Sequence, residues 1–195
     1  MSNRTASIKR ATGETRISCE LNLDGTGATS VATGIGFLDH MLHALAKHAR
    51  FDLVIECEGD LYVDDHHTAE DCAIALGQAL DEALRDRTGI ERFASAYAPL
   101  DEALGRAVVD LVSRPHATVE LPLVHQKVGD MSCEMIPHVF ESIALNGRFT
   151  LHVDLIRGRN DHHRIEACFK ALALALRHAV RATGDDAAPS TKGVM

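Results

Sequence analysis

The sequence contains no tryptophan, and only 4% of its 195 residues are aromatic. A core must therefore be filled mainly by Ala, Leu, Ile and Val, in a chain whose length suits one globular domain. No window comes near the roughly 18 to 20 apolar residues that a membrane span needs, and the first ten residues contain no apolar run. We therefore expect a soluble chain without a membrane span or a signal peptide.

Blocks of Lys and Arg are also missing, and the formal net charge is -8. Binding to a phosphate backbone needs clustered cations, so this composition argues against a nucleic-acid partner. The cysteines form no CxxC pair, which is typical of reduced thiols and makes the cytoplasm the expected location. They are Cys19, Cys57, Cys72, Cys133 and Cys168.

What the chain does contain is a stretch that occurs twice. Residues 66–84 (HHTAEDCAIALGQALDEAL) align without a gap to residues 162–180 (HHRIEACFKALALALRHAV), with nine identical positions. The similarity continues upstream, where His40 aligns with His138. Because no linker rich in Pro, Gly or Ser separates the copies, the repeat indicates one duplicated domain rather than two domains.

Strands and helices alternate along the chain. Residues 15–23 alternate polar and apolar side chains and lead into Asp24–Gly27, which predicts an opening strand and a hairpin-like turn. Further strands are expected at 51–58, 107–111 and 117–124, with helices from about His40 to His48 and from His66 to Leu84, and Arg92 near a helix start. The expected organisation is a single domain, 1–195, with half-domains at about 10–88 and 100–183 and a tail at 184–195.

The duplicated motif and its upstream histidines predict metal binding. On a helix, residues i and i+4 lie on one face, so His66 and Glu70 can chelate one ion while His67, turned by about 100°, points elsewhere. Imidazoles combined with a carboxylate suit first-row divalent ions. The candidate ligands are His40, His66, His67, Glu70, His138, His162, His163 and Glu166.

Repeat symmetry divides these eight groups into two sites of three His and one Glu. The site of His66 and Glu70 would be completed by His163 and by one upstream histidine, either His40 or His138, and the second site mirrors the first. An ion that accepts six ligands keeps open positions at such a site, which is typical of catalysis.

Five stretches closely resemble the imidazoleglycerol-phosphate dehydratase family of histidine biosynthesis: GIGFLDHML (34–42), DDHHTAED (64–71), PLDEAL (99–104), RNDHHRIEACFKAL (159–172) and PSTKGV (189–194). The resemblance covers nearly the whole chain. It implies an α+β fold of duplicated half-domains, with two β-sheets packed with helices. It also implies two Mn²⁺ ions per active site, held by the eight ligands, and a homo-oligomer of 24 subunits with active sites at subunit interfaces.

The resemblance further implies which residues contact a small phosphate-bearing substrate. These are Glu14, His40, His48, His66, Glu70, Arg92, Arg114, Lys170, Ser190, Thr191 and Lys192, with the two arginines and the tail serving the phosphate. Taken without the resemblance, Glu14 is typical of a solvated edge carboxylate, the arginines of solvated turns, and the tail of a frayed terminus.

The implied reaction removes a hydroxyl from the carbon beside an imidazole ring and a proton from the next carbon. No carbonyl acidifies that proton, so the ring itself must expel the hydroxyl, assisted by a metal ion on a ring nitrogen. The candidate catalytic groups for proton transfer are Glu14, His48 and Glu166. A binuclear metallohydrolase or a metal-storage protein would also need His and Glu ligands, but neither requires the paired arginines and Lys192.

Overall fold

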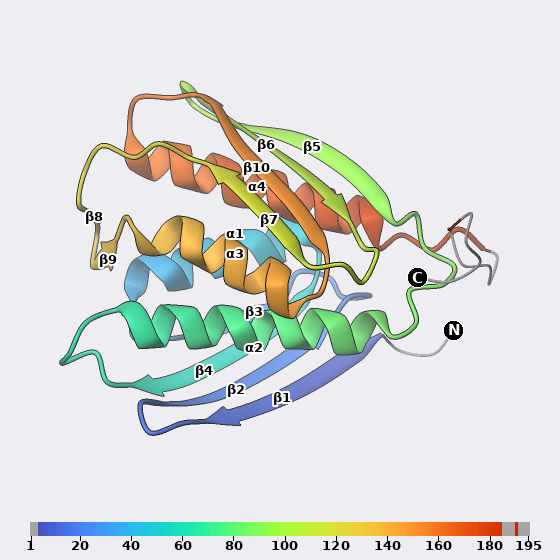
Figure 1. The fold of residues 1–195 in the computed structure, drawn as a ribbon, viewed down its shortest axis with the longest axis horizontal. Helices are drawn as coiled ribbons and strands as arrows, with labels where there is room; N and C mark the ends of the chain where they lie inside the picture. The colour runs from blue at the N-terminus through green and yellow to red at the C-terminus, as the bar shows by residue number, and fades with distance from the viewer. Residues whose placement is uncertain (1–3, 185–189, 191–195) are drawn as a thin grey trace.

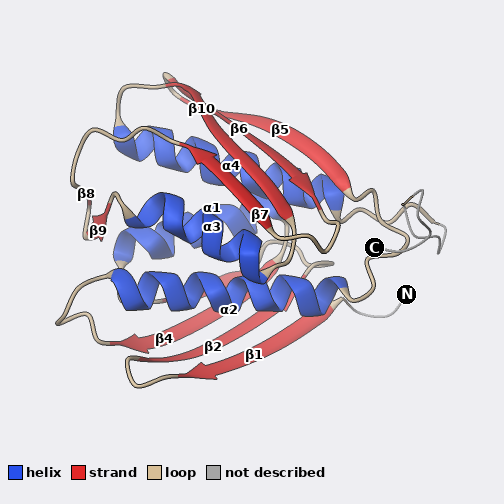
Figure 2. Ribbon diagram, viewed as in Figure 1, coloured by secondary structure: helices blue, strands red, loops and turns tan. Residues whose placement is uncertain are grey.

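The computed structural model describes residues 4–184 and Ser190. Within this part, the chain forms two four-stranded sheets with four helices enclosed between them (Figure 1 and Figure 2). The two halves repeat one order of elements: two strands, a short strand, a helix, a strand and a second helix. This architecture confirms the α+β fold of two sheets packed with helices.

The first half forms the sheet with strand order β1-β2-β4-β3, in which only the β3–β4 pair is parallel. Its elements are β1 (Thr5–Ala11), β2 (Thr15–Asn22), β3 (Thr29–Ala32), α1 (Gly36–Ala49), β4 (Asp52–Gly59) and α2 (His66–Leu84).

The second half repeats this topology with strand order β5-β6-β10-β7, and here only the β7–β10 pair is parallel. Its elements are β5 (Phe93–Leu100), β6 (Ala103–Asp110), β7 (His116–Glu120), α3 (Met135–Asn146), β10 (Thr150–Arg157) and α4 (Asp161–Ala179). A small hairpin, β8 (Lys127–Val128) and β9 (Met131–Ser132), lies between β7 and α3 and has no counterpart among the described residues of the first half.

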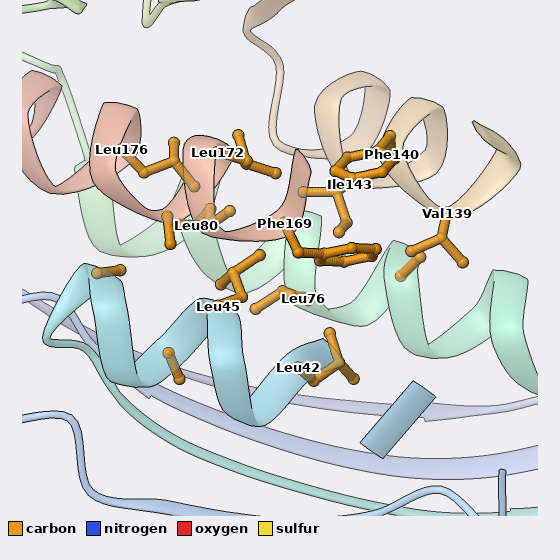
Figure 3. Packing of buried hydrophobic residues seen from close by; sticks show 14 of the residues in the cluster. Leu42, Leu45, Leu76, Leu80, Val139, Phe140, Ile143, Phe169, Leu172 and Leu176 are labelled. Carbon is orange, nitrogen blue, oxygen red and sulfur yellow. The ribbon is translucent and has the colours of Figure 1, made fainter. Parts of the chain in front are cut away.

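The four helices form the interior of the molecule, with each half packed against the other. Helix α2 covers β1 and β2 and contacts α3, whereas α4 covers β5 and β6 and contacts α1. At their centre the rings of Phe140 and Phe169 lie 4.3 Å apart, surrounded by leucines from α1, α2 and α4 and by Val139 and Ile143 from α3 (Figure 3). The packing is close enough that a Cβ on Gly77 or Gly105 would lie 2.7 Å from the backbone of a neighbouring helix.

Three local predictions were wrong. The described part of the chain begins with β1, not with β2; strand β1 lacks a clear apolar alternation, because Ala6 is its only buried residue. Asp24–Gly27 is not a hairpin, since β2 is followed by β3, which pairs with β4; the Asp52 carboxylate holds this loop by accepting backbone N–H groups from Thr26, Gly27 and Ala28. Arg92 precedes strand β5 instead of a helix.

None of the described helices is both long enough and apolar enough to cross a membrane.

Candidate metal centres and active site

The two His-His pairs begin the two long helices, at the same end of the molecule. Each pair follows an aspartate with a buried side chain, Asp65 before α2 and Asp161 at the start of α4. Asp65 accepts hydrogen bonds from the backbone and hydroxyl of Ser132, and Asp161 accepts from the backbone of Val124 and His125. The segment between β7 and α3 is thereby fastened to both histidine-bearing helix ends.

One candidate metal centre, called site A, consists of His40 from α1 with His162 and Glu166 from α4. The Nε2 atoms of His40 and His162 lie 3.1 and 3.2 Å from the same oxygen of Glu166, Oε2. The two imidazole rings have centroids 5.4 Å apart. The i,i+4 spacing on α4 thus brings its two groups together, and the packing of α1 on α4 supplies the third.

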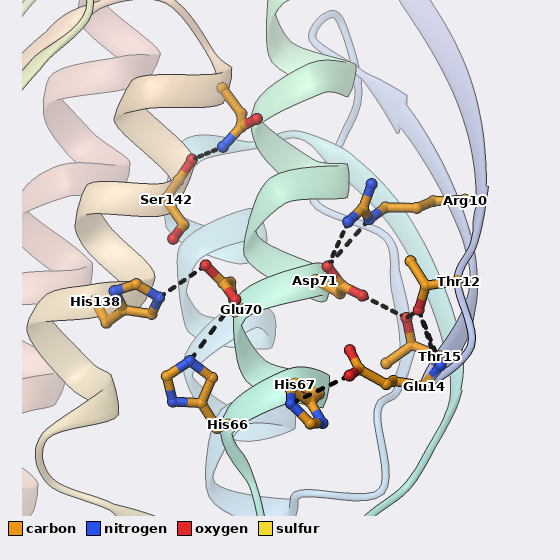
Figure 4. A network of polar contacts seen from close by, with 11 residues as sticks. Arg10, Thr12, Glu14, Thr15, His66, His67, Glu70, Asp71, His138 and Ser142 are labelled. Carbon is orange, nitrogen blue, oxygen red and sulfur yellow. Dashed lines mark hydrogen bonds and ion pairs between the residues drawn. The ribbon is translucent and has the colours of Figure 1, made fainter.

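The second centre, called site B, consists of His66 and Glu70 from α2 with His138 from α3 (Figure 4). The Nε2 atom of His138 lies 3.0 Å from Glu70 Oε1, and that of His66 lies 3.7 Å from Glu70 Oε2. Of the two upstream histidines that the sequence left open, the structure places His138 beside His66 and Glu70. Each site therefore combines groups from both halves of the chain.

The remaining ligand candidates, His67 and His163, lie outside both clusters. Their rings are turned by 80° and 86° from those of their neighbours His66 and His162. His67 Nδ1 is 3.0 Å from Asp60, and His163 Nδ1 is 2.8 Å from Glu102. These hydrogen bonds, more than any other contact, raise the pKa of both histidines. The expected grouping of His163 with His66 and Glu70 is thus not formed within one chain.

Glu14 lies in the turn between β1 and β2, with Oε1 3.5 Å from His67 Nε2 (Figure 4). The turn is fastened to α2 through the buried carboxylate of Asp71, which accepts hydrogen bonds from Arg10 and from the Thr15 hydroxyl. Asp71 directly follows Glu70 in the chain. The turn that carries Glu14 is therefore held beside the start of α2.

His48 and Lys170 lie beside site A, one on α1 and the other one turn after Glu166 on α4. Partial burial and, secondarily, the charge of Lys170 lower the pKa of His48. The Lys170 ammonium donates a hydrogen bond to the carbonyl of Pro99. At neutral pH, His48 is thus an uncharged group next to a fixed cation.

The two arginines that are expected to contact the phosphate lie at the opposite end of α4. The backbone N–H of Arg92 bonds to the carbonyl of Ala179, and its buried guanidinium forms an ion pair with Asp110. Arg114 is exposed, and its carbonyl accepts from Thr150, the first residue of β10. Of the tail residues, Ser190 is described, whereas Thr191 and Lys192 lie outside the described residues.

Comparisons with known proteins identify the family. Residues 33–176 match the family model for imidazoleglycerol-phosphate dehydratase, and this match includes every residue of sites A and B. The chain belongs to the imidazoleglycerol-phosphate dehydratase family. It is therefore an enzyme of the hydro-lyase class, in a family of histidine biosynthesis.

Relatives and solved structures of this family resemble the chain over almost its whole length. A dehydratase of Saccharomyces cerevisiae is 53% identical over 100% of both chains. One of Phytophthora nicotianae is 62% identical over 98% of this chain, which spans only 42% of that longer protein. The crystal structure of the Staphylococcus aureus dehydratase superposes with a TM-score of 0.83 at 38% identity, covering 92% of this chain and 99% of the other. That of Pyrococcus furiosus, in complex with (S)-C348, gives 0.83 at 34% identity, covering 96% and 100%.

Sequence reasoning missed the carboxylates that contact or anchor the candidate site residues. Asp60, Asp71 and Glu102 each contact or anchor a candidate site residue but belong to no repeat of the ligand pattern. A weak signal existed for Asp65 and Asp161, because an aspartate precedes the His-His pair in both copies. Only the folded chain shows which of these acids face the imidazole rings.

Proposed function

We propose that the chain converts imidazole glycerol phosphate to imidazole acetol phosphate, with two divalent metal ions, expected to be Mn²⁺, in each active site. The observation that carries this proposal is the pair of three-group clusters, sites A and B. Each contains a histidine that is followed in the chain by another, His67 or His163, which belongs to neither cluster. Two imidazole nitrogens and a carboxylate oxygen are a suitable donor set for a first-row divalent ion.

The residues fit such an ion. In each site, one ligand atom from every member lies within 4.8 Å of the others, so an ion between them would need only small side-chain movements. The imidazoles approach the carboxylate through Nε2, the atom that would face the ion. Bound there, the ions would supply Lewis acidity that polarises the substrate and stabilises negative charge on its ring.

Completing each site requires a second copy of the chain. His67 and His163 have Nδ1 engaged with carboxylates, which leaves Nε2 available for a metal ion, yet neither ring lies in site A or site B. If neighbouring subunits contribute these two histidines, all eight predicted ligands are used. This supports the homo-oligomer with interfacial active sites, of 24 subunits, that the family resemblance implies.

The position of the arginines gives independent support for shared sites. Ala179, which binds the backbone of Arg92, lies 17 residues after His162 in α4, or about 26 Å at the helical rise of 1.5 Å per residue. In the substrate, only a three-carbon chain separates the imidazole ring from the phosphate, which is far shorter. One subunit therefore cannot hold the ring at site A and the phosphate at Arg92, but two subunits can.

Among the candidate bases, the geometry favours Glu14. Both site A histidines approach Oε2 of Glu166, so this carboxylate would bind the metal ion and would not be free to accept a proton. Glu14 instead lies beside His67 and would enter a neighbouring active site together with it. There its carboxylate could remove the proton from the carbon next to the departing hydroxyl. Neutral His48 and the Lys170 cation lie beside site A, where they could orient the substrate.

The test is a turnover assay with imidazole glycerol phosphate, in the presence and absence of Mn²⁺. We expect a product lighter by one water, and activity that disappears with a chelator and returns with Mn²⁺. Inorganic phosphate is measured in the same samples. Release of phosphate without loss of water would contradict the proposal and would instead support a metallohydrolase.

A further inference from the structure

His67 and His163, the two histidines outside sites A and B, occupy equivalent positions in the repeat. The carboxylates that accept hydrogen bonds from them come from different positions in the two halves. His67 is held by Asp60, which follows strand β4, whereas His163 is held by Glu102, in the turn between β5 and β6. Building on the proposed function, we propose that Asp60 and Glu102 are positioning residues. Each fixes its histidine in the tautomer that presents an unprotonated Nε2 to a metal ion shared with a neighbouring subunit.

Glu102 is held rigidly in this role. Its Oε1 accepts two backbone hydrogen bonds, from Arg159 and Asn160, each 2.9 Å long. Its other oxygen, Oε2, lies 2.8 Å from His163 Nδ1. An ionised carboxylate can only accept, so Nδ1 must carry the proton and Nε2 of the neutral ring keeps its lone pair. These backbone and imidazole hydrogen bonds all favour the ionised form and lower the pKa of Glu102.

Asp60 fixes the same tautomer with less support. Both of its carboxylate oxygens lie near His67 Nδ1, at 3.0 and 3.2 Å. Among the described residues, His67 is the only partner of this carboxylate in a hydrogen bond or ion pair. A neutral amide at position 60 could therefore rotate its oxygen toward Nδ1 without losing another contact.

Because of this difference between the halves, Glu14 does not hold the Nδ1 atom of its histidine as Glu102 does. Glu14 and Glu102 are counterparts, because each directly precedes the second strand of its half, and each faces the equivalent histidine. Since Asp60 already holds His67 at Nδ1, Glu14 is not needed there and lies against Nε2 instead. The two counterparts thus have different tasks: Glu102 orients a ligand, and Glu14 is available for proton transfer.

The decisive variant is Glu102→Gln, which has the same shape as the native side chain. Because two backbone N–H groups require an oxygen at one terminal atom, the amide NH₂ must face His163 Nδ1. The ring then accepts at Nδ1 and carries its proton on Nε2, where the metal should bind. Titration calorimetry with Mn²⁺ alone should show one of the two equivalents per subunit bound about 10- to 100-fold more weakly than in wild type.

Two further measurements distinguish positioning from folding. Asp60→Asn should weaken Mn²⁺ binding less than Glu102→Gln does, because its oxygen can turn toward the ring, whereas Asp60→Ala should reach the full effect. Saturating Mn²⁺ should restore turnover to Glu102→Gln, whereas Glu14→Gln should bind Mn²⁺ normally and stay inactive. Glu20→Gln, an exposed glutamate on β2, is the matched control and should bind both ions as wild type does.

Wild-type affinity for both equivalents in Glu102→Gln and in Asp60→Ala would overturn this inference, as would an equal loss in Glu20→Gln. If Glu102→Gln fails to fold, as shown by circular dichroism of the metal-free protein, Asp60→Ala decides alone, because its loop loses no backbone contact. Failure of the proposed function has a different signature: the wild-type protein itself would not bind two Mn²⁺ per subunit.

Discussion

The Nε2 atom of His40, in the first half of the chain, lies 3.1 Å from Oε2 of Glu166 in the second half. The mirrored pair, His138 and Glu70, is separated by 3.0 Å. Each candidate metal centre is therefore built by both halves together, so each half contributes side chains to both centres.

Replacing His162 by Ala removes one of the three groups of site A. We expect turnover to fall by more than roughly tenfold, the lower end of what is lost when residues that merely orient metal ligands are changed. Bound Mn²⁺, measured by elemental analysis, should fall below two per subunit. His66→Ala should behave in the same way through site B. The control is His178→Ala, an exposed histidine near the other end of α4. Near-normal turnover and metal content in the two site variants would refute the ligand assignment.

Arg114 and Arg92 should respond differently to replacement by Ala. Arg114 is exposed, so Arg114→Ala should raise KM for the phosphate substrate while leaving the free energy of unfolding within about 0.5 kcal/mol of wild type. Arg92→Ala should raise KM as well, but it also deprives Asp110 of its ion-pair partner, at a cost of up to about 3 kcal/mol. Denaturant unfolding and steady-state kinetics separate the two effects. An unchanged KM in both variants would show that the two arginines do not contact the substrate.

Asp71→Ala should detach the turn that carries Glu14 from helix α2, because Arg10 and Thr15 lose their common acceptor. We expect a lower kcat with both Mn²⁺ ions still bound, since Asp71 lies outside sites A and B. Calorimetry with Mn²⁺ and steady-state kinetics test this separation. Loss of metal in parallel with kcat would mean that Asp71 acts on α2 and its ligands rather than on the Glu14 turn.

Removing the metal should weaken the assembly, because ions shared between subunits link metal binding to association. Light scattering of the protein treated with a chelator should show smaller particles, which regain their size when Mn²⁺ is restored. A particle of unchanged size with no bound metal would show that side-chain packing alone holds the interfaces.

On acidification, the shared ions should be released at a higher pH than they would be if His67 and His163 had the pKa of an ordinary histidine. Hydrogen bonds to Asp60 and Glu102 raise the pKa values of His67 and His163, so protons compete with the metal already above the usual value of about 6.5. In the metal-free protein, by contrast, the same shifts stabilise the fold below about pH 6.5, and this contribution is lost as the pH rises through the raised pKa. Opposite slopes of melting temperature against pH, with and without Mn²⁺, would display both effects.

The sequence predicted the α+β fold, but it left open how the candidate ligands group in space. The pairing of His66 with Glu70, and of His162 with Glu166, could be predicted because residues four apart on one helix always lie close together. Which upstream histidine joins Glu70 depends on α3 packing against α2, a contact across the two halves that periodicity does not encode. The role of Glu102 depends on the hairpin of β5 and β6, and β5 itself was not predicted.

The crossed arrangement of sites A and B also has a historical consequence. If the two halves were once separate copies of one short chain, a single copy would have carried the helix with the His-x-x-x-Glu pair and the upstream histidine, yet could not have joined them into a metal site. Two identical copies related by a two-fold axis would have formed both sites at once, with the same residues on each side of the interface. Fusion would then have made that pairing permanent and freed each copy to mutate independently. Asp60 in one half and Glu102 in the other are the kind of divergence that a symmetric pair of identical chains could never have acquired.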